Sequence, residues 1–150
     1  MAALPGTDPQ PDVIVHASCV ALRNSAVLIC GASGRGKSSL ALELMSRGAR
    51  LISDDRTCLI LRPRGVIAYA PRSLLGMIEA RCIGILRADP AAPTRVDLIL
   101  DLDQTETTRM PTPKSRDLLG QSVPLVHKTD SAHFPAAILQ YLLGGPWTKI

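Results

Sequence analysis

The chain has 150 residues, enough for one domain with a sizeable hydrophobic core, and we expect no second domain. No apolar run approaches the ~20 residues that a membrane-spanning helix needs, and aromatic residues at 3% are too few for a base-stacking surface. We therefore expect binding to neither a membrane nor nucleic acid, and the formal charge of +4 suits an acidic ligand such as a nucleotide.

Both ends of the chain are expected to be tails. Residues 1–12 have neither the basic flank nor the apolar centre of a secretory signal, so we predict a flexible tail there, a domain over residues 13–145 and a second tail over 146–150. The cysteines stand singly in apolar stretches without the spacing of a metal site, which predicts reduced core thiols in a cytoplasmic protein. They are Cys19, Cys30, Cys58 and Cys82.

Three strands are predicted at the start of the domain. Strands are predicted over residues 13–17 and 19–22, and residues 23–25 form a turn into a third run, 26–30, which is rich in β-branched residues. The short connections predict an antiparallel start to the sheet. The third run is uninterrupted and apolar, which is typical of a strand buried on both faces.

The segment that follows fits the phosphate-binding pattern G-x-x-x-x-G-K-[ST] without a mismatch, and a helix is predicted over residues 39–47. Glycines allow the backbone to approach an anion, and the start of the helix directs its N–H groups and dipole toward it. Lys37 is then expected at the β- and γ-phosphates, with the Ser38 hydroxyl as a Mg²⁺ ligand. The nucleotide-binding candidates are Gly31, Ala32, Ser33, Gly34, Arg35, Gly36, Lys37 and Ser38.

The rest of the chain predicts a mixed α/β domain in which helices flank a β-sheet. We expect a mobile connection over residues 102–125, because it is polar and contains Pro111 and Pro113, with a helical turn at 116–119. A closing amphipathic helix is predicted over 134–143. The other predicted elements are strands at 49–53, 58–61, 66–69, 83–86 and 96–102, and a short helical stretch at 73–79.

Asp54 and Asp55 form the second chemical feature, at the end of the predicted strand that follows the loop helix. Adjacent carboxylates repel, so one of them is expected to turn toward a cation or to have a raised pKa. Alone, the pair indicates no more than a turn. Beside a phosphate-binding loop, it suits phosphoryl transfer, with one carboxylate directed at a metal and the other accepting a proton from the attacking hydroxyl.

Two further features are weaker when taken alone. His16 lies among apolar residues, where a histidine is more often part of the core than of a site. Glu79 and Arg81, on alternate positions before an apolar run, indicate the end of a helix with a solvated charge pair.

Together, these residues resemble the catalytic domain of HPr kinase/phosphorylase. That family carries, in order, a histidine, a G-x-S-G-x-G-K-S loop, an L-[IV]-x-D-D strand end and an E-x-R-G-x-G-I signature. The chain has His16, the loop 31–38, the strand end 51–55 and the segment 79–85 in the same order and at similar intervals. The resemblance covers residues 13–102.

The resemblance implies a fold similar to that of phosphoenolpyruvate carboxykinase and an ATP- and Mg²⁺-dependent serine kinase. Its substrate would be HPr, the small phosphocarrier of the phosphotransferase system, and some family members reverse the reaction by phosphorolysis. By position, Asp55 would exchange the serine proton, His16 would orient it and Lys37 would neutralise phosphate charge. Ser38 and Glu79 would hold Mg²⁺, Asp54 would support the site, and Arg109 would be a catalytic arginine after the long strand.

The chain also departs from the family pattern. It resembles a short form that consists of the catalytic domain alone, and a hexamer is typical of the family. Cys82 stands where the signature has a glycine, residues 89–94 replace a long flexible loop, and the segment linked with the reverse activity is not recognisable in residues 124–130.

Two other functions are compatible with the phosphate-binding loop. A small-molecule kinase predicts an arginine-rich lid, for which Arg109 and Arg116 are candidates. A module that senses a nucleotide without turnover predicts that Asp55→Asn leaves function intact.

Overall fold

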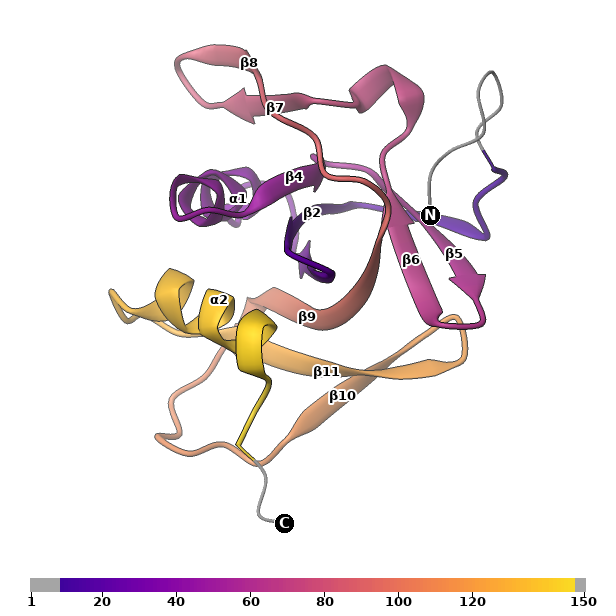
Figure 1. Ribbon diagram of the computed structural model, residues 1–150. Helices are drawn as coiled ribbons and strands as arrows, with labels where there is room; N and C mark the ends of the chain where they lie inside the picture. The colour runs from indigo at the N-terminus through magenta and orange to yellow at the C-terminus, as the bar shows by residue number, and fades with distance from the viewer. Residues whose placement is uncertain (1–8, 148–150) are drawn as a thin grey trace.

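The structure is a computed structural model that describes residues 9–147. In this range the chain forms a mixed β-sheet, a separate two-stranded sheet and two α-helices (Figure 1). The elements are β1 (Val13–Val15), β2 (Ala17–Leu22), β3 (Ser25–Cys30), α1 (Lys37–Ser46), β4 (Arg50–Ser53), β5 (Thr57–Arg62), β6 (Gly65–Tyr69), a 3-10 turn (Arg72–Leu74), β7 (Met77–Ala80), β8 (Gly84–Arg87), β9 (Thr94–Thr105), β10 (Lys114–Leu118), β11 (Gln121–Lys128) and α2 (Phe134–Gly144).

Strand β9 organises the main sheet. One of its edges pairs in parallel with β3. Beyond β3 the sheet continues with β2, which is antiparallel to both of its neighbours, and ends with β4. The other edge is shared, because β6 pairs with its first residues and β11 runs parallel to its later part. The sheet therefore divides into two branches, one with β6, β5 and β1 and the other with β11 and β10.

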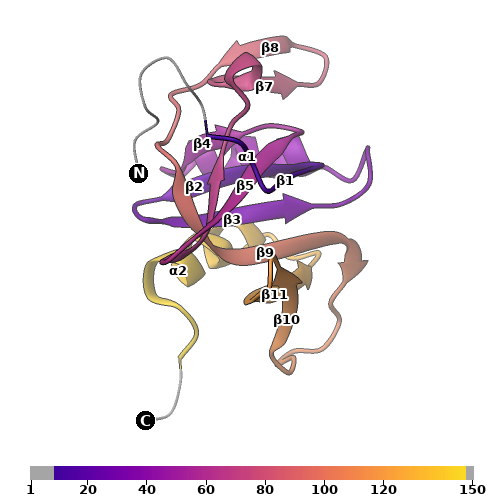
Figure 2. The same cartoon turned by 90° about the vertical axis from the view of Figure 1, so that its right-hand side faces the viewer.

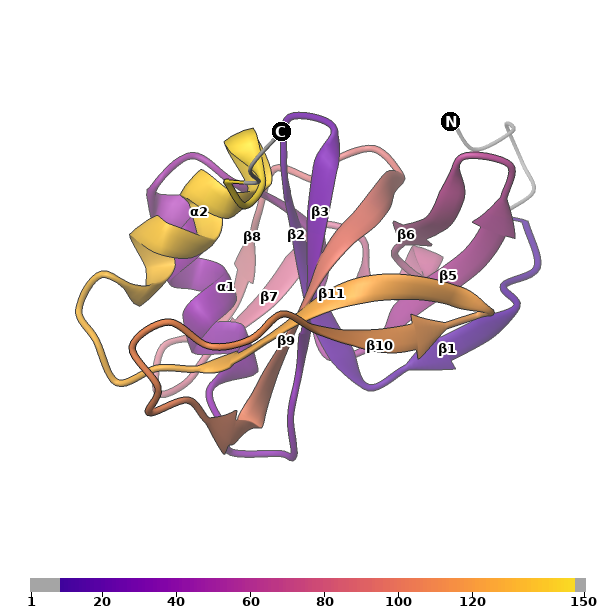
Figure 3. The same ribbon diagram turned by 90° about the horizontal axis from the view of Figure 1, so that it is seen from below.

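Both faces of the central strands are buried. Leu98 and Leu100 of β9 pack in the cluster that contains α1 and α2, whereas Ile99 belongs to the opposite cluster with Leu28 and Leu59. Figure 3 shows the two helices on one side of β2 and β3, and β5, β6 and β1 on the other. Successive side chains of a strand point to opposite faces, so an uninterrupted apolar run is required here.

The topology brings several strand ends to one edge of the sheet. Strands β3 and β9 are parallel, and β4 has the same direction because both β3 and β4 run antiparallel to β2. The carboxyl ends of β3, β4 and β9 therefore meet where β2 begins. Ligand sites in α/β folds commonly form at such an edge.

The structure confirms the mixed α/β class, the antiparallel start and the closing helix. It corrects the helical stretch predicted at 73–79, because only Arg72–Leu74 form a 3-10 turn and Met77–Ala80 form β7, which pairs with β8. Burial alternates along β7, with Ile78 buried and Glu79 exposed, and this period of two is that of a strand. In Figure 2 the β7–β8 hairpin lies apart from the main sheet.

The prediction of a mobile connection over 102–125 is wrong for most of that range, because only residues 106–113 and the turn at 119–120 lie outside strands. Strand β9 extends to Thr105, and β10 and β11 form a hairpin in place of the helical turn predicted at 116–119. The hairpin turn is made by Leu119 and Gly120, with φ values of 50° and 82°. Turns with two positive φ values usually carry Asn-Gly, so leucine at the first position hides the signal.

The predicted tails lie partly outside the described range, which begins at residue 9 and ends at 147. At its start, the Tyr69 hydroxyl donates a hydrogen bond to the Pro9 carbonyl oxygen at 2.7 Å, and Asp12 accepts one from the Leu61 N–H at 2.7 Å. No helix among the described residues has the length and apolar character to span a membrane.

Candidate active site

The phosphate-binding loop connects the end of β3 to the start of α1. Gly31 is required there, because a Cβ atom at this position would lie 3.2 Å from the Leu102 Cβ and 3.3 Å from the Arg35 Cβ. Gly36 precedes the helix with a φ of 95°, a conformation that glycine adopts without strain. The loop therefore directs the first N–H groups of α1 toward the edge of the sheet where the strand ends meet.

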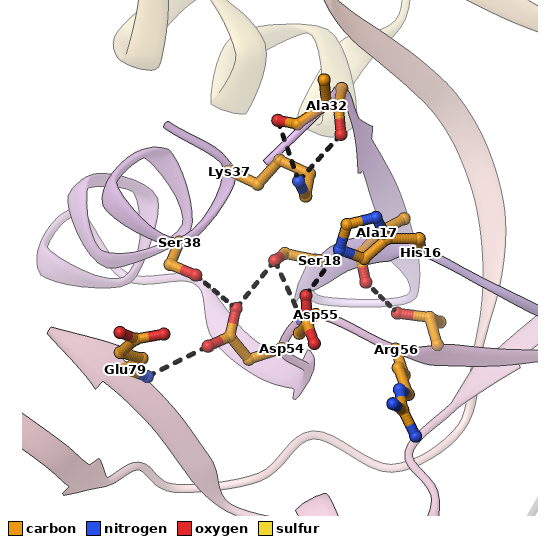
Figure 4. A network of polar contacts seen from close by, with 12 residues as sticks. His16, Ala17, Ser18, Ala32, Lys37, Ser38, Asp54, Asp55, Arg56 and Glu79 are labelled. Atoms are coloured by element: carbon orange, nitrogen blue, oxygen red, sulfur yellow. Dashed lines mark hydrogen bonds and ion pairs between the residues drawn. The ribbon is translucent and has the colours of Figure 1, made fainter. Parts of the chain in front are cut away.

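Lys37 is buried within this loop, with 7% of its surface exposed. Its ammonium group donates to the carbonyl oxygens of Gly31 at 2.8 Å and Ala32 at 3.3 Å (Figure 4). A buried ammonium group needs such partners, and these hold the positive charge inside the curve of the loop.

Asp54 is buried at the end of β4 and joins three other elements. Its Oδ1 accepts hydrogen bonds from the hydroxyls of Ser18 at 2.8 Å and Ser38 at 2.7 Å, and its Oδ2 accepts one from the Glu79 N–H at 3.0 Å (Figure 4). An ionised carboxylate only accepts hydrogen bonds, so the three donors suit the charged form. Asp54 thus links β2, the start of α1 and β7.

Asp55 has different surroundings. Its side chain is 61% exposed, and its Oδ1 lies 2.7 Å from the Nε2 atom of His16. Its backbone has a φ of 68°, in the left-handed region that residues other than glycine seldom adopt. The left-handed turn separates the two carboxylates, with Asp54 held inside and Asp55 beside the open pocket.

A polar pocket of about 320 Å³ lies between the loop and the β7–β8 hairpin. Glu79 and Arg81 reach it from β7 and from the hairpin turn, so the helix end predicted for them is wrong. The pocket is lined by Ser33, Gly34, Gly36, Lys37, Ser38, Ser39, Asp55, Glu79 and Arg81.

The pocket presents several oxygen atoms, which are the ligands that a hard divalent cation prefers. Within residues 9–147, no cluster of three His, Cys, Asp or Glu side chains could hold a metal by itself. Magnesium is usually bound through one or two carboxylates together with phosphate and water oxygens. The Ser38 hydroxyl and the Glu79 carboxylate are the groups of this pocket that could serve as such ligands, whereas Asp54 lies behind Ser38 and is not part of the pocket lining.

Arg109 is exposed in the segment between β9 and β10, and it is not among the residues that line the pocket. Its catalytic role stays a prediction.

Asp103 is a residue of this edge that the sequence did not reveal. Its carboxylate accepts the Ala32 N–H at 3.0 Å and lies 3.3 Å from the Arg35 Nε. It is near the end of β9, which runs parallel to β3. The feature that could have identified Asp103 is its place as an acidic residue at the carboxyl end of a parallel strand. This place is known only once β9 has been paired with β3.

The cysteines only partly follow the prediction of core thiols. Cys19 and Cys58 are buried and Cys30 is partly buried, but Cys82 is exposed in the β7–β8 turn. Burial raises the pKa of the Cys19 and Cys30 thiols, so both stay uncharged at neutral pH. Cys82 has a φ of 68°, so it adopts a conformation suited to the glycine that the family signature has at this position.

Comparison with known proteins identifies the family of the chain. The family model described as HPr Serine kinase C-terminal domain matches residues 10–114. An HPr kinase/phosphorylase of Stenotrophomonas maltophilia is 33% identical over 132 aligned residues, covering 77% of this chain and 42% of that protein. One of Alkaliphilus metalliredigens is 36% identical over 118 residues, covering 73% of this chain and 37% of that protein.

A solved structure of the Hpr(Ser) kinase/phosphatase from Coxiella burnetii has the same fold. The TM-score is 0.72 at 24% sequence identity, and the match covers 86% of this chain and 87% of that one. The chain spans less than half of the length of the two curated relatives described above. The match to the family model over most of the chain shows that this protein belongs to the HPr serine kinase C-terminal domain family.

Proposed function

We propose that this protein is an ATP- and Mg²⁺-dependent serine kinase that phosphorylates the phosphocarrier HPr in the cytoplasm. The observation that carries the proposal is a single polar pocket lined by Lys37 and Ser38 of the loop, by Asp55 and by Glu79. A phosphate-binding loop alone is common to many nucleotide-binding proteins. The exposed carboxylate of Asp55 beside it adds a group that accepts a proton.

The loop is proposed to bind the phosphates of ATP. Its backbone N–H groups and the start of α1 attract the anion, and Lys37 neutralises charge on the β- and γ-phosphates. The domain that carries out this step comprises residues 13–145. HPr, as a protein substrate, then presents its serine at the mouth of the pocket.

Asp55 is proposed to act as the general base. Its carboxylate accepts the proton of the HPr serine hydroxyl while the hydroxyl oxygen forms a bond to the γ-phosphorus and the bond to the ADP oxygen breaks. His16, 2.7 Å from the Asp55 Oδ1, orients this carboxylate. The pocket acts mainly by positioning the reacting groups and neutralising phosphate charge, because phosphoryl transfer needs little covalent catalysis by a protein.

Ser38 and Glu79 are proposed to hold Mg²⁺, with Asp54 supporting the Ser38 hydroxyl through their 2.7 Å hydrogen bond. The ion would neutralise charge on the transferred phosphoryl group.

The first prediction tests the general base. Asp55→Asn keeps the size of the side chain but cannot take up the serine proton, so we expect the turnover number for HPr phosphorylation to fall by about 10²- to 10⁴-fold. The rate is measured by transfer of labelled phosphate from ATP to HPr of the same organism.

The matched control is Asp89→Asn, which removes an exposed carboxylate that pairs with Arg50 at 3.0 Å outside the pocket. It should leave the rate within about twofold, as surface substitutions usually do. Equal rates for Asp55→Asn and Asp89→Asn would exclude Asp55 as the base.

A further inference from the structure

Ser18 lies on β2 beside the Asp54–Asp55 turn, and none of the motifs identified in the sequence includes it. Its side chain is fully buried, with no exposed surface. It is the second residue of β2 and follows His16, which lies in the bend between β1 and β2, by two positions. In Figure 4, Ser18 lies between the two aspartates.

The hydroxyl of Ser18 makes two different hydrogen bonds. It donates to the Asp54 Oδ1 at 2.8 Å, and its oxygen accepts the backbone N–H of Asp55 at 3.3 Å. A hydroxyl has one hydrogen to donate and lone pairs to accept, so one group serves both neighbours. The position of the Asp54 carboxylate is thereby coupled to the backbone of Asp55.

This coupling matters because the Asp55 backbone is strained. A residue with a φ of 68° and a side chain persists in that conformation only when its surroundings hold it. His16 contacts the side chain of Asp55, whereas Ser18 holds its backbone. If the turn relaxed, the exposed carboxylate would leave its place beside the pocket while the buried Asp54 kept its other donors.

We propose that Ser18 is a positioning residue for phosphoryl transfer, which fixes the left-handed turn at Asp55 and keeps Asp54 bound to Ser38. The inference rests on the proposed kinase function and deepens it. Ser18 touches no pocket surface and acts through the two aspartates.

Thr57 offers a matched control. It is as buried as Ser18, and its hydroxyl donates to the Ala17 carbonyl oxygen at 2.9 Å, but it makes no hydrogen bond to either aspartate. Ser18→Ala and Thr57→Val each remove one buried hydroxyl at the same edge of the sheet. If the Ser18 hydroxyl contributed only to stability, both substitutions would change the turnover number alike.

The kinetic test compares the two variants in HPr phosphorylation. Ser18→Ala is expected to lower the turnover number by about 10- to 100-fold, as loss of a group that orients catalytic side chains usually does. Its affinity for ATP, measured by calorimetry without Mg²⁺, should stay within about twofold of wild type, because Lys37 and the loop N–H groups are untouched. Turnover numbers that are equal in Ser18→Ala and Thr57→Val would overturn the proposal.

Amide hydrogen exchange followed by NMR provides a readout that needs no activity. We expect the Asp55 amide to exchange at least about tenfold faster in Ser18→Ala than in Thr57→Val, while amides in the middle of β3 and β9 keep their protection. An unchanged Asp55 amide would overturn the role of Ser18. If the wild-type protein transferred no phosphate to HPr, the kinase proposal would fail, and the exchange result would still decide whether Ser18 holds the turn.

Discussion

Asp54 and Asp55 are adjacent in sequence, yet the fold gives their carboxylates opposite surroundings. Asp54 is 7% exposed and accepts three hydrogen bonds, whereas the Asp55 side chain is 61% exposed and contacts His16. A left-handed residue between β4 and β5 makes this possible, because it reverses the direction of the second side chain. Backbone strain of this kind is often found at functional sites, where it places a functional side chain correctly but lowers the stability of the fold.

A stability prediction follows at the same residue. Asp55→Gly and Asp55→Ala both remove the contact with His16, but only glycine adopts a φ of 68° without strain. We therefore expect Asp55→Gly to have a free energy of unfolding about 1 kcal/mol higher than that of Asp55→Ala in urea denaturation.

The same pair of substitutions at Asp89 is the control, since that residue does not have a positive φ. There, alanine should be at least as stable as glycine, because glycine loses more backbone entropy on folding. If Asp55→Ala matched or exceeded Asp55→Gly in stability, the turn would not be strained in solution.

At the scale of elements, the β9–β10 connection is held by an ion pair. The Lys114 Nζ donates to the Glu106 Oε1 at 2.8 Å, and the Thr108 N–H donates to the other carboxylate oxygen at 3.1 Å. The hydrogen bonds from Lys114 and Thr108 lower the pKa of Glu106 to about 2, from an ordinary value of 4.5.

The pH dependence follows from the direction of this shift. Because folding lowers the pKa, the contribution of Glu106 to stability is complete above pH 4.5 and is lost as the pH falls toward about 2. We expect the Glu106 carboxyl carbon to titrate in NMR with a midpoint well below 4.5 in the wild type, and Lys114→Met to raise that midpoint. A wild-type midpoint near 4.5 would mean that the pair does not form in solution.

Elements with a strong local signal could be predicted from the sequence. The buried runs before the loop and the apolar stripe of residues 134–143 gave correct strands and a correct helix. The β7–β8 and β10–β11 hairpins could not be predicted as hairpins, although the strand predicted at 83–86 is confirmed by β8. Strand β7 has only four residues, β11 contains Pro124, and the β10–β11 turn carries leucine where asparagine is usual.

At the scale of the molecule, the candidate site is assembled from segments far apart in the chain. His16 directly precedes β2 and Ser18 lies near its start, the loop follows β3, the aspartates follow β4, and Glu79 belongs to the separate hairpin. The common direction of β3, β4 and β9 places these segments at one edge. The main sheet is thus the scaffold of the pocket, and the hairpin forms its opposite wall.

The sequence could predict the parts of this site that form continuous motifs, namely the loop and the paired aspartates. It could not predict the contacts of Ser18 and Asp103, because each is made with a residue distant in sequence. Single serine and aspartate residues carry no local pattern. Their contacts become visible only once the fold brings distant segments together.

The most direct test of the account is the mass of HPr after incubation with the protein, ATP and Mg²⁺. The account predicts that intact HPr gains one phosphate, that fragmentation places it on a serine, and that the gain is lost with Asp55→Asn. Unmodified HPr, together with ATP binding shown by calorimetry, would contradict the kinase function and favour a small-molecule kinase or a nucleotide sensor.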